Sequence, residues 1–120
     1  MIAEADYLKL DAVAQADLVR RGEVTAGEFL EAAIRRADRI NPRMNAIVLP
    51  MYEIARARAR ERLDGPLAGV PFLLKDLHQD YAGVPATSGS NALRRARAVP
   101  ERHSEIVERH LAAGLVIFGR

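Results

Sequence analysis

Two short, almost purely apolar runs, at residues 67–74 and 115–118, constrain the fold of this chain more than any other feature. Neither run alternates with polar residues, as expected for strands that are covered on both faces. Between them, residues 101–113 have the pattern of a helix closed by Gly114. One side of that helix is apolar and carries Ile106, Val107 and Leu111. Strand, helix and strand in this order predict a right-handed parallel crossover, and hence an α/β fold.

The residues before the first strand carry helical patterns. Residues 5–21 lack proline and glycine and stop at Gly22, which predicts one helix. A short extended piece is expected at residues 46–49, followed by another helix at residues 51–63. Four arginines alternate with other residues along that last helix, and we interpret them as a solvated face. They are Arg56, Arg58, Arg60 and Arg62.

The middle helix has the clearest sequence signal. Thr25 followed three residues later by Glu28 forms a capping-box pattern, and the apolar residues behind it recur at helical spacing. Asn41 and Pro42 are expected to end this helix. We therefore divide the chain into a mainly helical layer, residues 1–64, and the start of a central sheet, residues 65–120.

Composition excludes several functional classes. The 120 residues include 18 Lys and Arg against 16 Asp and Glu, a net charge of +2, so wholesale phosphate or nucleic-acid binding is not indicated. There is no cysteine, which excludes disulfides and thiolate chemistry. No apolar run approaches the roughly 20 residues of a membrane helix, so we expect a cytoplasmic protein without membrane contact. His103 and His110, seven residues apart, are too distant along a helix to share a metal ion, and packing roles are expected for both.

The expected sheet is too small to be complete. Two parallel strands, each apolar on both faces, cannot cover themselves, because a sheet needs about three or more strands or full helical cover. The second strand is followed only by Gly119 and Arg120. We therefore expect residues 1–120 to be the amino-terminal part of one larger domain, which could associate through its uncovered sheet or as a homodimer.

Lys75 is the leading candidate for a functional residue. It follows the first strand at its carboxyl end, where parallel sheets carry their functional groups. The chain has only one other lysine, Lys9, although arginine is common. A buried lysine can act as a base whereas arginine cannot, but Lys75 could equally cap the strand by pairing with Asp76 or solvent. The long connection at residues 76–100 is more typical of a functional loop than of a simple linker.

The residues around Lys75 resemble a known family. Residues 69–76, Gly-Val-Pro-Phe-Leu-Leu-Lys-Asp, are similar to a segment of the amidase signature family, the Ser-cisSer-Lys amidohydrolases. Further resemblance, in the family's order, lies at residues 21–25, 41–46, 87–90 and 112–119. The chain is thereby identified as the amino-terminal portion of a member of this family.

The resemblance implies amide hydrolysis by a serine, serine and lysine triad, with Lys75 as the catalytic lysine and neither cofactor nor metal. In that scheme a neutral lysine takes a proton from a bridging serine, which activates the nucleophilic serine. Both serines belong to a segment that family members carry after the position of Arg120, so these 120 residues alone should be inactive. Ser88 and Ser90 are interpreted as turn residues. The apolar strand before Lys75 is expected to supply the burial that a lysine base needs.

The substrate implied is a small-molecule amide. The context of Lys75 is more similar to free-standing amidases, including those that open amides of linear or cyclic aminoacyl oligomers, than to the amidase subunit of the tRNA-dependent amidotransferase. One alternative is that the protein is itself this amidotransferase subunit. Another is a catalytically dead, truncated relative that serves as an interaction module through its first two helices.

Overall fold

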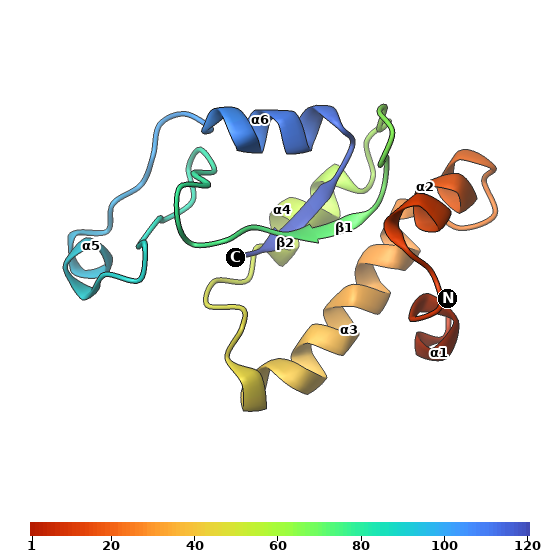
Figure 1. The fold of residues 1–120 in the computed structure, drawn as a ribbon, viewed down its shortest axis with the longest axis horizontal. Helices are drawn as coiled ribbons and strands as arrows, with labels where there is room; N and C mark the ends of the chain where they lie inside the picture. The colour runs from red at the N-terminus through yellow and green to blue at the C-terminus, as the bar shows by residue number, and fades with distance from the viewer.

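The computed structural model describes residues 1–120 as a small parallel sheet with helices on both faces (Figure 1). The order of elements is α1 (Glu4–Tyr7), α2 (Ala12–Arg20), α3 (Ala26–Met44), α4 (Tyr52–Arg58), β1 (Pro71–Leu73), α5 (Asn91–Ala96), α6 (Glu105–Ala112) and β2 (Val116–Gly119). Strands β1 and β2 are parallel, and α6 lies between them in sequence, which confirms the predicted crossover. No helix combines the length and the apolar character needed to cross a membrane.

Alternate residues of β2 bury opposite faces of the sheet, as successive side chains of a strand must. Val116 and Phe118 pack in one cluster with residues of α3 and α4. Ile117 packs on the other face, in a cluster with Val107 of α6 and with Leu74. All four residues of β2 are buried, as predicted. The prediction is wrong for β1, which is only half-buried and leaves Leu73 39% exposed.

Helix α3 begins where the sequence predicts. The Thr25 hydroxyl accepts a hydrogen bond from the Glu28 backbone N–H at 3.1 Å, and the Glu28 carboxylate accepts one from the Thr25 N–H at 3.0 Å. The predicted end at Pro42 is wrong, because the helix continues to Met44 and ends at Asn45 in the left-handed conformation. A proline in the last turn removes only one backbone hydrogen bond, which the end of a helix tolerates better than its middle.

The single helix predicted at residues 5–21 is two helices. Helix α1 ends at Tyr7, and α2 starts at Ala12. Between them Asp11 caps α2, accepting a hydrogen bond from the Ala14 N–H at 2.8 Å. An aspartate side chain that competes for backbone donors favours such a break over a continuous helix.

The segment after α3 pairs with the outer edge of β2, so the expected extended piece lies against the sheet. Val48 and Leu49 donate their backbone N–H groups to the Arg120 carbonyl, and Pro50 and Gly119 form an antiparallel bridge. Strand β2 is therefore flanked on both edges. The helix that follows, α4, is shorter than predicted and ends at Arg58.

Arg58 corrects the prediction of a fully solvated arginine face. Its guanidinium donates to the Leu115 carbonyl at 2.8 Å and to the Leu111 carbonyl at 2.7 Å, and its side chain is only 21% exposed. Arg58 therefore links α4 to the carboxyl end of α6 and to the turn before β2.

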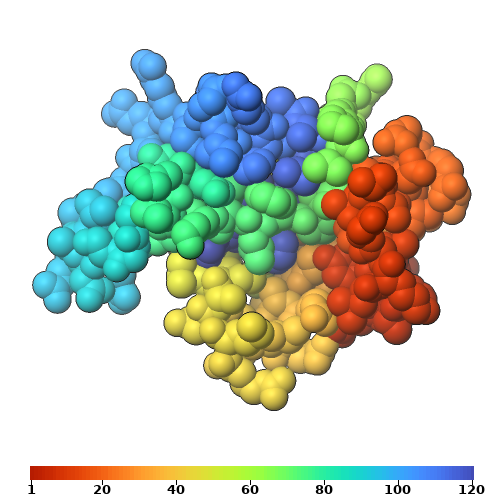
Figure 2. Space-filling view, viewed as in Figure 1, coloured from red at the N-terminus to blue at the C-terminus, as the bar shows by residue number.

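Helix α6 is also shorter than predicted, starting after Ser104. Val107 is fully buried, but Ile106 is 42% exposed and does not share its side of the helix. The molecule extends over 45 × 31 × 20 Å, and the segment around α5 projects from one end (Figure 2). No residue of α5 is buried.

Candidate active site

Lys75 stands where the sequence predicts, directly after the last hydrogen bond that joins β1 to β2. That bond runs from the Leu74 N–H to the Gly119 carbonyl at 2.9 Å. The Lys75 N–H leaves the sheet pattern and donates to the Gln79 side-chain oxygen at 3.2 Å. The sheet hydrogen bonding therefore ends at Leu74, just before Lys75, and the sheet does not dictate the direction of the Lys75 side chain.

The Lys75 side chain is exposed, and its amine has no ion pair or hydrogen bond within residues 1–120. The expected burial by the preceding strand is thus wrong for these residues, because β1 is itself half-exposed. Of the alternative in which Lys75 pairs with Asp76 or solvent, the structure shows the solvent contact and not the pair, since Asp76 binds other partners.

Asp76 is the centre of the hydrogen bonding at this end of the sheet. Its carboxylate accepts from the Thr87 N–H at 3.1 Å, from the Thr87 hydroxyl, from the Gly89 N–H at 3.5 Å and from Arg120 at 3.2 Å. Burial raises the pKa of the Asp76 carboxyl, but these hydrogen bonds outweigh it and hold the pKa below its usual value. Asp76 is therefore ionised at neutral pH and ties three segments together.

Arg120 is the most deeply buried charged side chain at this site, at 1% exposed. One terminal nitrogen donates to Asp76, and the other donates to the Gln79 carbonyl at 3.2 Å. Its Nε is buried and has no hydrogen-bond partner. Because a buried guanidinium requires a counter-charge, Asp76 is the partner that makes this position of Arg120 possible.

The loop at residues 87–90 is shaped to meet Asp76. Ser88 and Gly89 both have positive φ, at 48° and 70°, and this turn brings the backbone N–H groups of Thr87 and Gly89 to one carboxylate. Ser90 then caps α5, its hydroxyl accepting from the Leu93 N–H at 3.4 Å. The interpretation as a turn residue is confirmed for Ser88, whereas Ser90 caps a helix that was not predicted from the sequence.

A groove of about 730 Å³ opens beside this network. Asp76 and Arg120 form part of its wall, together with Thr87, Ser90 and residues of α5. Lys75 does not line it. The groove thus combines apolar side chains with several polar and charged ones next to the end of β1.

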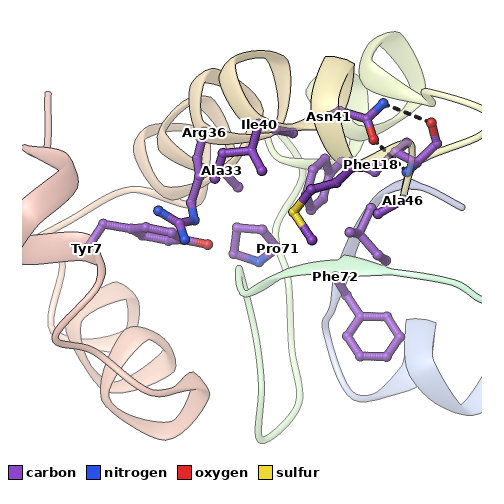
Figure 3. A pocket seen from close by; sticks show the side chains of 13 residues that line it. Tyr7, Ala33, Arg36, Ile40, Asn41, Ala46, Pro71, Phe72 and Phe118 are labelled. Atoms are coloured by element: carbon purple, nitrogen blue, oxygen red, sulfur yellow. Dashed lines mark hydrogen bonds between the residues drawn. The ribbon is translucent and has the colours of Figure 1, made fainter.

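A second, largely apolar pocket lies between α3 and β1 (Figure 3). Tyr7 and Arg36 approach Pro71 at one end of it, and Asn41 closes the other end with two hydrogen bonds to the Ile47 backbone. Its lining is mostly apolar, and its polar side chains, Tyr7, Arg36 and Asn41, include no carboxylate, amine or imidazole, so we assign it a packing role.

The two histidines have packing roles, as predicted. His110 packs against the Phe72 ring, with centroids 4.7 Å apart. His103 packs edge-on against Tyr81 and accepts a hydrogen bond from the Ala82 N–H at 3.0 Å. His103 precedes α6 rather than lying on it, which corrects the prediction that both are on one helix.

The Asp76–Arg120 ion pair is the feature of this site that sequence reasoning missed. The signal was present, because an acidic and a basic residue each follow one of two predicted parallel strands. The carboxyl ends of parallel strands lie at the same edge of a sheet, so the two charges could have been placed together.

Comparison with known proteins gives a consistent result. The Amidase family model matches residues 28–120. The chain is 42% identical over 110 residues to 6-aminohexanoate-cyclic-dimer hydrolase of Paenarthrobacter ureafaciens, covering 92% of this chain and 22% of that protein. It is 39% identical over 113 residues to the putative amidase AmiC of Mycobacterium tuberculosis (strain ATCC 25618 / H37Rv), covering 92% and 23%. The chain thus spans about a fifth of the length of these curated relatives.

Solved structures agree in fold. A 6-aminohexanoate cyclic dimer hydrolase complexed with substrate matches with a TM-score of 0.86 and 40% identity, covering 92% of this chain and 23% of that one. A bacterial aryl acylamidase of the amidase signature family matches with a TM-score of 0.81 and 29% identity, covering 92% and 24%. The predicted α/β start of a larger sheet corresponds to the amino-terminal part of these structures.

Proposed function

Because the chain belongs to the amidase family, we propose that the protein hydrolyses carboxylic amides and that Lys75 is the base that starts the reaction. The observation that carries this proposal is the position of Lys75 at the carboxyl end of β1, with an amine that no carboxylate binds. A lysine paired with a carboxylate is held in its charged form and cannot accept a proton. An unpaired lysine can, once it is shielded from water.

The proposed chemistry needs Lys75 and two serine hydroxyls. Lys75 accepts a proton from the first serine, which accepts one from the second, and the second serine oxygen attacks the amide carbon. The amine leaves with a proton returned through the same groups. Water then attacks the acyl-enzyme ester and releases the carboxylic acid, restoring the serine. Residues 1–120 supply the lysine of this scheme.

We further propose amides of aminoacyl oligomers, linear or cyclic, as the substrate class. The similarity of residues 72–77 to amidases of this kind supports the choice, as does the name of the cyclic-dimer hydrolase among the relatives. The groove beside Asp76 also carries Asn91, Arg94 and Arg97, whose side chains could hydrogen-bond to repeated amide units.

The test compares both lysines of the chain in the full-length gene product, using the cyclic dimer of 6-aminohexanoate and 4-nitroacetanilide as substrates. Lys75→Ala is expected to lower kcat by about 10² to 10⁴-fold, the usual contribution of a positioned base, with the melting temperature unchanged. Lys75→Arg should fail equally, because arginine keeps its proton. Lys9→Ala removes an exposed lysine that pairs with Asp6 and should retain full activity. Full turnover by a folded Lys75→Ala protein would refute the assignment.

A further inference from the structure

We propose that Asp76 and Arg120 form a positioning pair for Lys75: Arg120 engages the neighbouring carboxylate, fixing the backbone next to Lys75 and leaving its amine unpaired. This inference rests on the proposed function, since it gives the pair a task in the reaction of Lys75. Neither residue is proposed to touch the substrate.

Arg120 is held from its backbone as well as its side chain. Its carbonyl accepts from the N–H groups of Val48 at 2.8 Å and Leu49 at 3.1 Å, and its own N–H donates to the Leu49 carbonyl at 3.0 Å. The guanidinium then extends to Asp76 and the Gln79 carbonyl. A planar guanidinium fixed at two nitrogens sets both the distance and the orientation of what it binds.

Asp76 has no accepting capacity to spare. A carboxylate offers about four lone-pair sites, and four donors already occupy this one: two from Thr87, one from Gly89 and one from Arg120. Lys75, although adjacent in sequence, finds no acceptor there. The ion pair with Arg120 thus prevents a Lys75–Asp76 pair that would favour the charged form of the lysine.

Lys75 is fixed on both sides as a result. On one side Leu74 is bonded to Gly119. On the other side the Asp76 carboxylate is bonded to Arg120, the residue that directly follows β2. The residues before and after Lys75 are therefore tied to two consecutive residues, Gly119 and Arg120, at the end of β2. Such double attachment is what a base needs if its nitrogen is to reach a serine hydroxyl within hydrogen-bonding distance.

Stability alone is a weak reason for this pair. Removing two charges from water costs free energy that their attraction only partly returns, and apolar replacements of buried ion pairs are often neutral or stabilising. Exposed arginines are abundant elsewhere in the chain, so an arginine buried beside the residue that follows Lys75 is better explained by what it does to its neighbours.

The experiment measures kcat and KM separately in the full-length gene product with the cyclic dimer of 6-aminohexanoate. Arg120→Met and Asp76→Asn should each lower kcat about 10-fold or more while KM changes less than about threefold, because the base is misplaced and the substrate site is intact. The double variant should be no slower than the slower single variant, since both changes break one interaction. Arg120→Lys, which keeps the charge but not the two-nitrogen contact, should recover part of the loss.

An exposed pair provides the matched control. Arg62 and Asp64 lie 3.7 Å apart with side chains 91% and 83% exposed. Arg62→Met with Asp64→Asn should leave kcat unchanged. If the variants of Asp76 and Arg120 keep kcat within about twofold of the parent, or if their effects multiply in the double variant, the positioning role is refuted.

A milder substitution keeps the test decisive if Arg120→Met or Asp76→Asn does not fold. Thr87→Val removes the hydroxyl donor to Asp76 at nearly constant volume, and Thr87→Ser keeps it. We expect Thr87→Val to lower kcat about threefold or more with KM unchanged, and Thr87→Ser to restore it. A folded Thr87→Val protein with the parent kcat refutes the role of the network.

Lys75→Ala, assayed in parallel, separates the two proposals. If Lys75→Ala is inactive while the variants of Asp76, Arg120 and Thr87 turn over normally, the positioning pair is wrong and the proposed function stands. If Lys75→Ala itself retains full activity, the proposed function fails, and the positioning pair fails with it.

Discussion

Gly114 allows the sharpest test of how the sheet is assembled. It follows α6 with a φ of +88°, and a Cβ added there would lie 2.6 Å from both the Ala68 Cα and the Asp64 carbonyl oxygen. The backbone on both sides is fixed, because the Gly69 N–H donates to the Gly114 carbonyl at 2.9 Å. Gly114→Ala therefore combines a strained backbone conformation with a collision against main-chain atoms.

The expected cost is worked from these two contributions. A non-glycine residue in the left-handed region costs about 1 kcal/mol, and forcing packed backbone apart costs about 1–3 kcal/mol. Gly114→Ala should therefore lower the free energy of unfolding by about 2–4 kcal/mol. Gly22→Ala provides the control, because Gly22 has a φ of +71° but no atom within 4 Å of an added Cβ. It should lose only the conformational contribution, about 1 kcal/mol.

Urea denaturation of the purified protein, followed by far-ultraviolet circular dichroism, measures both variants. The difference between the two losses of unfolding free energy measures the cost of the close approach between Gly114 and residues 64–68. Equal destabilisation by Gly114→Ala and Gly22→Ala would mean that residues 64–68 do not pack against the end of α6, and the account of this turn would be wrong.

Three further changes follow from the same contacts. Hydrogen bonds from the Thr25 backbone and side chain and from the amino terminus lower the pKa of Glu28 from 4.5 to about 2. The stabilising effect of the Glu28 carboxylate is therefore complete above pH 4.5 and is lost as the pH falls toward 2. Glu28→Gln should flatten this acid dependence of the melting temperature. Arg58→Met should lower the free energy of unfolding by about 1–3 kcal/mol, because two carbonyls lose their donor, whereas the exposed Arg60→Met should change it little. Phe29→Ala, at a fully buried position, should cost about 3–5 kcal/mol in a urea titration.

The elements that the sequence predicts well are those specified by neighbouring residues. The start of α3 depends on Thr25 and Glu28, three residues apart, and it lies where predicted. The break before α2 is equally local, but the apolar pattern continues through it, and only the Asp11 cap reveals it. Local signals are therefore reliable when capping residues are weighed together with hydrophobic spacing.

Features that depend on distant residues were harder to predict. Arg58 looks like one member of an exposed arginine series, yet it binds two carbonyls more than 50 positions further along the chain. Ile106 fits the apolar side of α6 in sequence but faces outward, because Val107 takes the buried position. The exposure of Lys75 depends on what covers β1, and the apolar character of the preceding residues does not specify that.

The position of Lys75 was predictable whereas its surroundings were not. A lysine after an apolar strand is placed by the geometry of the parallel sheet. Its lack of a counter-ion depends on Arg120 and on the loop at residues 87–90, both far along the chain, which together occupy Asp76.

The location of β2 between two neighbours has a consequence for how the chain acquires its structure. The two partners of β2 are the segment around Pro50 and strand β1, and both are synthesised before it. Their apolar side chains therefore stay exposed to solvent until β2 is available. Each pairing closes a long loop, which costs entropy before any contact compensates for it. The sheet therefore cannot form until Ile117 and its neighbours have been synthesised, and we expect its folding to be slow. A nascent chain that lacks these residues should be prone to aggregate.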